Sequence, residues 1–398
     1  MRAVGIVAEY DPFHLGHSYH IAETRRLLGE NVPVVCVMSG SWRQRGECAL
    51  TDKWTRAGLA LRGGADLVLE LPLVWAISSA EGFARGAVEH LKATGVVDTL
   101  SFGSESGEGE VLKTLALTLE SEEYRTALHT ELDKGISFAQ AREKAAEKCA
   151  GKTARLLRGP NDSLGVEYLH AAEDSLKCVT VKRQGVSHDS DCPAEGFASA
   201  TLIRDMIRAG QWEEAARWLP EGTVERLQDS GVADRKNVER AFLACLRSMT
   251  EADFTALPDS GAAEGLPTRL VKAAGKAESL EEFYALAKTK RYAHARIRRL
   301  ALWAFLGLTA ADRGKKPEYL RVLGMNGRGK ALLREMKERS ALPIITKPAH
   351  IRELGEEAQS LFALECRGTD LFGLCFDKIR PCGMDYTTGP VIMSQSGM

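Results

Sequence analysis

Two histidines near the start of the chain have a spacing that suits phosphate chemistry. His14 and His17 stand three residues apart, with Gly16 between them and Pro12 just before. Residues three apart share one side of a helical turn, so both imidazoles can face one ligand. A helix N-terminus presents unpaired N–H groups to a phosphate, and a glycine lets the ligand approach the backbone. We predict that His14 and His17 are catalytic residues that donate hydrogen bonds to phosphate oxygens during nucleotidyl transfer.

A second candidate group lies in residues 197–204, FASATLIR. Ser199 is suited to cap the helix that follows, because its hydroxyl can accept a first-turn N–H group. Ser199, Thr201 and the first-turn amides could hold a phosphate, with Arg204 as the charged partner. A plain helix cap beside a surface arginine is the alternative. The position of this group, near the expected end of a Rossmann-like sheet, favours a catalytic role.

The elements expected to position these groups alternate between strands and helices. Strands are expected at residues 3–8, 32–38, 67–71, 99–103 and 178–183, with helices at 17–28, 52–63, 80–94, 108–123 and 163–175. This alternation is typical of βαβ units, which form a mostly parallel sheet covered by helices on both faces. Ligands of such sheets bind beyond the carboxyl ends of the strands. Polar residues follow several of the expected strands at that edge.

From about residue 212 helical patterns follow one another and strand patterns nearly vanish. We therefore predict an α/β fold in two domains, for which 398 residues are sufficient. Residues 1–211 would form a Rossmann-like, parallel-sheet nucleotidylyltransferase domain. Residues 212–398 would form a mainly helical domain.

Two groups in the first half are ambiguous on the sequence. Arg43, Arg45 and Glu47 follow the second expected strand, where they either touch a substrate or belong to a solvated loop. The charged residues at 52, 53 and 56 open a helix, and they either contact a ligand or form its polar face.

The composition excludes several classes of protein. Apolar residues make up 44% and charged residues 27%, which excludes disorder, collagen and coiled coil for most of the chain. No apolar run reaches the roughly 18 residues that a membrane span needs. The run at residues 3–8 is too short for a signal peptide, so a cytoplasmic location is expected. The nine cysteines are scattered without a CxxC pair, which favours free thiols, and no ligand set accompanies the histidine pair to bind a metal.

Residues 324–330 fit the GxxxxGK pattern of a P-loop. The next residue is Ala331, so the hydroxyl that binds Mg²⁺ in a P-loop is missing. We interpret this segment as a glycine-rich turn that opens a basic helix.

With these motifs in this order, the sequence resembles the HIGH-motif nucleotidylyltransferase superfamily and, within it, the bacterial tRNA(Met) cytidine acetate ligases. The blocks that carry the resemblance include EYDPFHLGH (9–17), MSGSWRQRGE (38–47), PNDSLGVEYL (160–169), FASATLIR (197–204), RYAHARIRRL (291–300) and YLRVLGMN (319–326). They run in order along essentially the whole chain. The family pattern has Asn at the positions of Asp11 and Leu15, so this chain carries an added carboxylate beside the expected triphosphate.

The resemblance implies an ATP-dependent ligase. Such enzymes convert acetate and ATP to acetyl-adenylate and pyrophosphate, then acetylate N4 of the wobble cytidine in elongator tRNA(Met), forming N4-acetylcytidine and AMP. ATP is the co-substrate, with Mg²⁺ expected to be carried on its phosphates. No covalent nucleophile is needed, because adenylation makes AMP the leaving group, so Cys48 is not expected to react. The ATP contacts that the resemblance implies are Val7, Ala8, Glu9, Tyr10, Asp11, Pro12, Phe13, Gly16, Ser18, His20, Gly103, Asn161 and Arg183.

A basic stretch lies in the second half, although the formal net charge of the chain is only -1. Tyr292, Arg296 and Arg299 fall on one helical stripe, which suits an RNA backbone and an unstacked base. A second basic stripe at residues 330, 334 and 337 has the same interpretation. Residues 212–398 would then be the tRNA-binding domain. The predicted tRNA contacts are Lys288, Lys290, Arg291, Arg296, Arg298 and Arg299.

Two other functions remain open on the sequence. A small-molecule nucleotidylyltransferase would use the same ATP site, but it needs no basic helical domain. A non-catalytic tRNA-binding protein with a decayed site would accommodate Asp11. ATP–pyrophosphate exchange driven by acetate separates these alternatives from the ligase. The sequence does not indicate the oligomeric state or the group that takes the proton from the cytidine amine.

Overall fold

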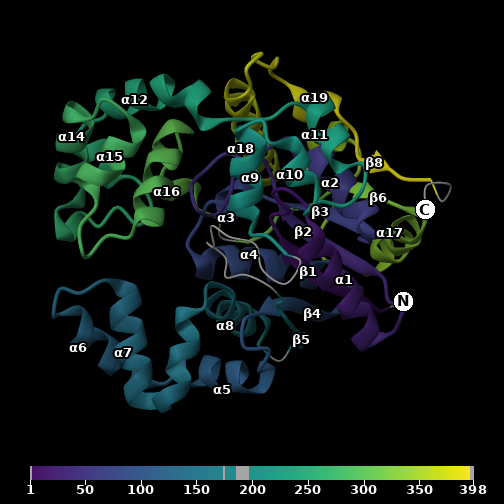
Figure 1. Ribbon diagram of the computed structural model, residues 1–398, viewed down its shortest axis with the longest axis horizontal. Helices are drawn as coiled ribbons and strands as arrows, with labels where there is room; N and C mark the ends of the chain where they lie inside the picture. Colours follow the sequence, from purple (N-terminus) through teal and green to yellow (C-terminus); the bar gives the residue numbers. More distant parts are fainter. Residues whose placement is uncertain (1, 174, 185–196, 315, 395–398) are drawn as a thin grey trace.

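The computed structural model describes residues 2–173, 175–184, 197–314 and 316–394 of the chain. Its centre is an eight-stranded sheet with the strand order β5-β4-β1-β2-β3-β6-β7, and β8 pairs with β6 (Figure 1). The first five strands pair in parallel, as the sequence predicts. They are β1 (Ala3–Ala8), β2 (Val34–Ser39), β3 (Leu67–Leu71), β4 (Val97–Ser104) and β5 (Lys177–Lys182).

Nine helices are described before residue 212, and three of them, α3, α6 and α7, were not predicted from the sequence. A 3₁₀ helix, η1 (Gly151–Arg158), joins α7 to α8. The nine are α1 (Leu15–Leu28), α2 (Lys53–Arg62), α3 (Leu73–Ala76), α4 (Ala80–Ala93), α5 (Gly109–Leu119), α6 (Glu122–Leu132), α7 (Phe138–Ala150), α8 (Pro160–Ala172) and α9 (Ala200–Arg208). α3 is a single short turn, while α6 and α7 bury few side chains, so their apolar pattern is weak.

The second half is mainly helical, as expected. Figure 1 shows α12 and α14 to α16 grouped at one end of the molecule. The helices are α10 (Trp212–Ala216), α11 (Thr223–Ser230), α12 (Glu239–Ser248), α13 (Glu251–Thr255), α14 (Leu266–Lys276), α15 (Leu280–Ala287), α16 (His294–Phe305), α17 (Gly327–Arg339), α18 (Glu356–Phe372) and α19 (Met384–Thr387). The predicted boundary at residues 211/212 stays a prediction.

The second half also contributes strands, which corrects the expectation that strands nearly vanish there. β6 (Leu320–Met325) runs antiparallel to β3, while β7 (Ile344–Ile345) and β8 (Val391–Ile392) run parallel to β6. Every residue of β6 is buried, including Arg321. A strand buried on both faces lacks the alternation of apolar and polar residues, and a charge inside it hides the pattern further.

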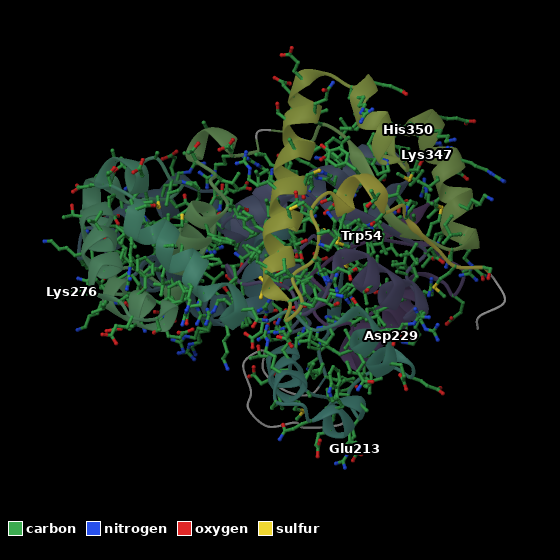
Figure 2. The ribbon with its side chains drawn as sticks, turned by 90° about the horizontal axis from the view of Figure 1, so that it is seen from above. Trp54, Glu213, Asp229, Lys276, Lys347 and His350 are labelled. Carbon is green, nitrogen blue, oxygen red and sulfur yellow. The ribbon has the colours of Figure 1, made fainter. Side chains whose placement is uncertain are left out.

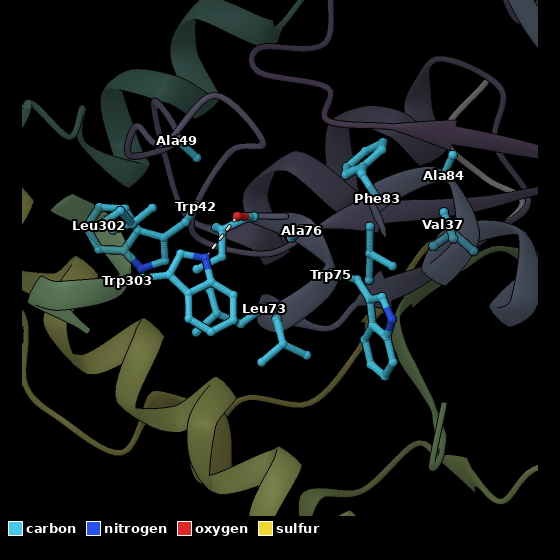
Figure 3. Close-up of a cluster of buried hydrophobic side chains, with 14 of the residues drawn as sticks. Val37, Trp42, Ala49, Leu73, Trp75, Ala76, Phe83, Ala84, Leu302 and Trp303 are labelled. Carbon is cyan, nitrogen blue, oxygen red and sulfur yellow. Dashed lines mark hydrogen bonds between the residues drawn. The ribbon is translucent and has the colours of Figure 1, made fainter. Parts of the chain in front are cut away.

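Buried hydrophobic side chains form two clusters in the described structure. The larger one joins the segment after β2 to the helical half (Figure 3). In it the indole of Trp303 donates to the Ile77 carbonyl at 3.0 Å, and that of Trp42 donates to the Gly368 carbonyl at 2.8 Å. These contacts hold α16 and α18 against the sheet domain.

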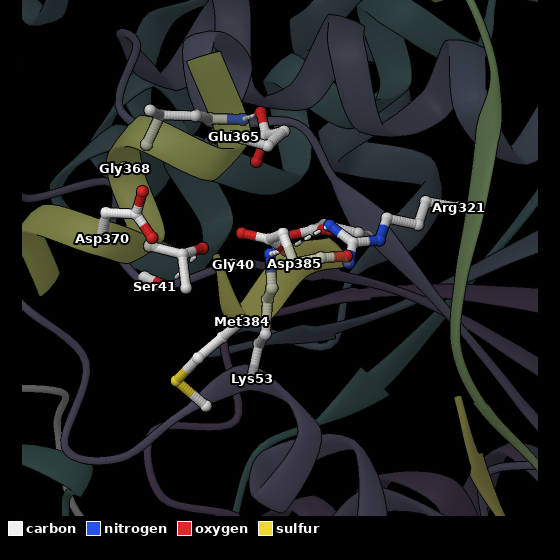
Figure 4. A network of polar contacts seen from close by, with 12 residues as sticks. Gly40, Ser41, Lys53, Arg321, Glu365, Gly368, Asp370, Met384 and Asp385 are labelled. Atoms are coloured by element: carbon white, nitrogen blue, oxygen red, sulfur yellow. Dashed lines mark hydrogen bonds and ion pairs between the residues drawn. The ribbon is translucent and has the colours of Figure 1, made fainter. Parts of the chain in front are cut away.

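A network of buried charges makes a second connection between the two halves (Figure 4). The ammonium of Lys53 lies 2.6 Å from Glu70 Oε1 and 2.6 Å from Asp385 Oδ1. Arg321 Nη1 lies 3.0 Å from Glu70 Oε2 and 2.5 Å from the same Asp385 oxygen. Lys53 therefore belongs to the protein interior, and its interpretation as a ligand contact or solvated polar residue is wrong.

Charged side chains cover the outside of the molecule, as seen from above at Glu213, Asp229, Lys276 and Lys347 (Figure 2). Among the described helices, none is both long and apolar enough to cross a membrane.

Candidate nucleotide-binding site

A pocket of about 540 Å³ lies beyond the carboxyl ends of β1, β4 and β5. This is the edge where ligands of parallel sheets bind. Its walls come from the segment after β1, from α1, from the loop after β2, and from the first turns of α8 and α9. The predicted catalytic and ATP-contact residues that line it are Val7, Ala8, Glu9, Tyr10, Asp11, His14, Gly16, His17, His20, Gly103, Asn161, Arg183, Thr201 and Arg204.

Four predicted residues do not line the pocket. Phe13 is buried against Gly63, where an added Cβ would lie 2.1 Å from the Phe13 ring. Pro12 follows a cis peptide bond that turns the chain toward α1. Ser18 lies in the first turns of α1, and Ser199 caps α9 by accepting the Leu202 N–H at 3.1 Å. These four residues are therefore neighbours in sequence of the lining residues and not part of the lining.

The two histidines form a mutually supporting cap at the N-terminus of α1. His14 Nδ1 accepts the Gly16 N–H at 3.0 Å, and His17 Nδ1 accepts the His14 N–H at 3.2 Å. A ring nitrogen that accepts a hydrogen bond carries no proton, so each imidazole is neutral with its proton on Nε2. The rings are stacked with their centroids 3.8 Å apart. The pocket is therefore lined by two imidazoles whose tautomer is set by the backbone.

Gly16 is required by this arrangement, because an added Cβ would lie 2.8 Å from His14 Cε1. We expect Gly16→Ala to displace the His14 ring and to lower the rate of nucleotidyl transfer at least tenfold, since a misplaced catalytic group loses much of its effect. Steady-state ATP–pyrophosphate exchange measures this rate. Gly275→Ala is the control, since nothing lies within 4 Å of a Cβ at that helical position.

The carboxylate of Asp11 is neutralised inside the protein. Its Oδ1 accepts the Leu50 N–H at 2.6 Å, and its Oδ2 lies 3.0 Å from Arg43 Nε and 3.8 Å from Arg204 Nη1. Burial by itself would raise the pKa of Asp11, but Arg43, Arg204 and Arg56 hold that pKa below its usual value. The added charge is therefore balanced by arginines.

Arg204 connects the two motifs that the sequence singled out. Its Nη1 donates to the Asp11 carbonyl at 2.7 Å, and its Nη2 donates to Thr201 Oγ1 at 2.9 Å. Thr201 and Arg204 thus reach the pocket beside the histidine motif. Ser199 caps α9, as both interpretations of this segment expected. Arg204 is buried, so the alternative of a surface arginine is wrong.

Glu105 is a functional neighbour that the sequence analysis missed. Its Oε1 accepts both the backbone N–H and the side-chain amide of Asn161, at 3.0 and 2.6 Å, and its Oε2 accepts the Asp162 N–H at 2.7 Å. A carboxylate therefore occupies the N-terminus of α8, so this helix end is not available to a phosphate. Held by Glu105, the Asn161 amide presents its oxygen as the remaining acceptor.

His20 has a different role from the other two histidines. Its Nε2 lies 3.0 Å from Ser101 Oγ. Burial, with Arg183 nearby, lowers the pKa of His20 to about 4, so this ring is neutral in the physiological range. Gly103 lies against Arg183, whose Cγ would be 3.4 Å from an added Cβ. These residues form the wall of the pocket on the β4–β5 side.

The loop after β2 carries ion pairs that lead from the pocket to α16. Arg43 pairs with Glu47, and Glu47 Oε1 accepts Arg298 Nη1 at 2.8 Å. Together these partners hold the pKa of Glu47 near 2 against the effect of burial. The Arg56 guanidinium is fully buried and donates to the Glu9 carbonyl at 2.6 Å, which makes it a structural link.

The six predicted tRNA contacts divide into two groups. Lys288, Lys290 and Arg291 precede α16 and are exposed. The other three, at positions 296, 298 and 299, lie on α16, and of the six only Arg298 lines the nucleotide pocket. The expected stacking role of Tyr292 is wrong, because its ring is buried and its hydroxyl donates to the Glu264 carbonyl at 2.9 Å. Tyr292 lies before the helix, so the assumed stripe does not include it.

The GxxxxGK segment opens the basic helix α17, as expected, but it begins within strand β6 and is therefore a connection between a strand and a helix. Asn326 caps α17, and an added Cβ at Gly329 would lie 2.0 Å from the Asp66 carbonyl oxygen. Gly329 therefore allows α17 to pack closely against the segment at Asp66.

Within the described ranges, no group of three or more His, Cys, Asp or Glu could hold a metal ion.

Known proteins resemble this chain over its whole length. The family model described as HIGH Nucleotidyl Transferase matches residues 1–385. The tRNA(Met) cytidine acetate ligase of Acetivibrio thermocellus is 34% identical, with 99% of this chain and 100% of the relative covered. That of Caldanaerobacter subterraneus subsp. tengcongensis is 37% identical, with 97% and 98% covered.

Two crystal structures of Thermotoga maritima TmcAL are also similar, at 34% identity over 99% of this chain and 100% of theirs. The apo form has a TM-score of 0.93, and the form bound with alpha-thio ATP has a TM-score of 0.90.

Proposed function

Because this chain belongs to the HIGH nucleotidyl transferase family, among the tRNA(Met) cytidine acetate ligases, we propose that it activates acetate with ATP and acetylates the wobble cytidine of elongator tRNA(Met). The pair of neutral imidazoles at the N-terminus of α1 is the observation that carries this proposal. It lies in the pocket where a parallel sheet binds nucleotides.

The first step is attack of an acetate oxygen on the α-phosphorus of ATP, with pyrophosphate as the leaving group. Negative charge builds up on the phosphate oxygens in this step, and preorganised donors stabilise it. The Nε2–H groups of His14 and His17 are such donors, because the backbone already occupies their Nδ1 atoms. Arg204 adds a positive charge to the same pocket.

We assign Mg²⁺ to the phosphates of ATP. The pocket lining holds three carboxylates, those of Glu9, Asp11 and Glu47, and each is already engaged by a backbone N–H group or by arginine side chains. Among the described residues, no dedicated carboxylate cage is left for the ion.

The second step transfers the acetyl group to N4 of the cytidine, with AMP as the leaving group. The tRNA reaches the pocket at the side of α16, where Arg298 forms part of the wall. Since tRNA and ATP are cytoplasmic, we propose the same location for the enzyme.

The test is incubation of the protein with ATP, labelled acetate and tRNA(Met), followed by mass spectrometry of the nucleosides. N4-acetylcytidine that depends on both ATP and acetate is the expected product. Pyrophosphate exchange without any tRNA label would favour a small-molecule nucleotidylyltransferase. Binding of tRNA with neither exchange nor label would favour a non-catalytic protein.

The exposed residues before α16 allow the two steps to be separated. We expect the triple variant with glutamine at Lys288, Lys290 and Arg291 to bind tRNA more weakly. The slope of log affinity against log salt should fall by roughly 0.7 for every phosphate that the variant no longer binds. Acetate-driven exchange should not change. A parallel loss of exchange would contradict the separate placement of ATP and tRNA.

A further inference from the structure

A small basic pocket lies beside the nucleotide pocket, between α16 and the loop that carries Asp259. The side chains of Arg296, Arg299 and Arg313 line it, together with Ser78 and Asp259. The Ser78 carbonyl accepts the Gln44 amide at 3.1 Å, and Gln44 belongs to the wall of the nucleotide pocket. The two pockets are therefore neighbours.

Two of the three arginines have acidic partners. Arg313 Nη2 lies 3.2 Å from Asp259 Oδ1, and Arg296 Nη1 lies 3.7 Å from Glu264 Oε2. Arg296 Nε also donates to the Asp259 carbonyl at 2.9 Å. Asp259, the carboxylate in the lining of this pocket, is thus paired with Arg313, and Arg296 has Glu264 outside the lining.

Arg299 is the third arginine of this pocket, and it differs from the other two in its partners. Within the described part of the chain, it makes neither a hydrogen bond nor an ion pair with a carboxylate within 4 Å. Burial lowers the pKa of its guanidinium to about 10; Asp259 opposes that shift, while Arg296 and Arg313 add to it. A partly buried arginine beside two like charges is normally paired, because removing a charge from water is costly. An anion from outside the chain would supply such a partner.

The chemistry of the donors points to a phosphate group. A guanidinium presents a planar fork that matches two oxygens of a phosphate. ATP is expected in the neighbouring nucleotide pocket, whereas an RNA carries a phosphate at each nucleotide. Resting on the proposed function, we propose that Arg296, Arg299 and Arg313 bind a backbone phosphate of the tRNA close to the nucleotide that enters the catalytic pocket.

Such a contact would set the register of the RNA. Arg298 lines the nucleotide pocket while Arg299, its neighbour on α16, lines the basic pocket. One phosphate held by Arg299 therefore fixes the backbone beside the entrance through which the target base must pass. Phosphate contacts position a nucleic acid without reading its sequence, and that is the role assigned here.

A substitution of Asp259 is expected to strengthen tRNA binding, whereas loss of an arginine of this pocket should weaken it. Its carboxylate competes with a phosphate for the same guanidinium groups. The residue has a positive φ of 54°, which asparagine adopts as readily as aspartate. Asp259→Asn therefore removes the competing charge without straining the backbone.

The test compares three variants by tRNA(Met) affinity at several salt concentrations and by acetate-driven ATP–pyrophosphate exchange. We expect Arg299→Met to weaken tRNA binding about tenfold and to reduce the salt slope by roughly 0.7, the value for a single phosphate. Asp259→Asn should strengthen binding. The control Arg26→Gln removes an exposed, paired arginine of α1 and should change neither quantity.

Thermal unfolding of the variants completes the test. Arg299→Met should not lower the melting temperature, because it removes a cation that lacks a partner. Unchanged tRNA affinity and salt slope in Arg299→Met would overturn the proposal, as would weaker binding in Asp259→Asn. A raised KM for ATP with unchanged tRNA binding would assign the anion to ATP and also overturn it. Failure of the parent protein to acetylate tRNA, with binding intact, would instead count against the proposed function.

Discussion

Replacing His17 with asparagine is expected to lower acetate-driven ATP–pyrophosphate exchange by about 100- to 1,000-fold, the usual effect of removing one donor to a developing charge. The asparagine oxygen takes the place of His17 Nδ1, so it can still accept the His14 N–H that the imidazole accepts at 3.2 Å. The variant keeps this hydrogen bond of the helix cap and loses the Nε2–H group, together with the ring contacts to His14, Tyr10 and Phe13. The initial rate of exchange at saturating ATP measures the loss.

Two further variants make this result specific. His17→Gln places an amide N–H near the former Nε2 position, and it should recover part of the lost rate. His129→Ala removes an exposed histidine of α6 and should leave exchange unchanged. Parental activity in His17→Asn, with an unaltered melting temperature, would show that the imidazole is not a donor in the reaction.

Replacing Lys53 with methionine is expected to lower the free energy of unfolding by about 3–5 kcal/mol at pH 7. The change removes the cation that lies 2.6 Å from both Glu70 and Asp385 and leaves a carboxylate buried without compensation. Glu365 lies beside this network, and burial raises its pKa well above the usual value. Urea unfolding of parent and variant, followed by circular dichroism, measures the difference.

The pH dependence of the free energy of unfolding tests whether Lys53 stabilises the protein through the buried carboxylates. Burial tends to raise the pKa of Asp385, but Lys53 and Arg321 lower it to about 2 in the folded protein. The stabilisation from this group is therefore complete above its ordinary pKa near 3.8 and is lost as the pH falls toward 2. The difference between parent and variant should shrink over that interval. The control Arg125→Met breaks an exposed pair with Glu122 and should cost at most about 1 kcal/mol.

An equal loss of stability in both variants would contradict the assignment of Lys53 to a buried network. So would a difference between parent and Lys53→Met that stays constant down to acid pH. The network matters beyond stability, because it links α2 of the nucleotide-binding half to β6 and α19 of the C-terminal half.

Much of the nucleotide pocket was accessible to sequence reasoning. The alternation of strands and helices predicted β1 to β5, and the polar residues after those strands met at one edge of the sheet. Glu105 could have been found by the same rule, because it follows β4 directly. Its task of capping α8 could not, since the two segments are 56 positions apart and meet only in the folded chain.

The basic stretch shows the limit of spacing arguments more clearly. Helical periodicity placed Tyr292 beside Arg296, and the Arg296 guanidinium does lie 5.3 Å from the centre of the Tyr292 ring. Yet α16 begins only at His294, and the Tyr292 ring is buried, so it is not open to a base. Periodicity assumes a helix that continues through the segment, and a turn before the helix breaks that assumption.

The sequence by itself determined the chemistry of the histidine motif. His14, Gly16 and His17 are close along the chain, so the geometry of one helical turn brings their groups together. Only the tertiary structure decided which charges are neutralised and which are left over. Ion pairs join separate segments of the chain: Asp11 with Arg43, Glu47 with Arg298, and Lys53 with Asp385. The burial of each pair decides how much it contributes to stability. Arg299 lacks an ion-pair partner among the described residues, and this too is visible only in the folded chain, where the neighbours of each charge are in place.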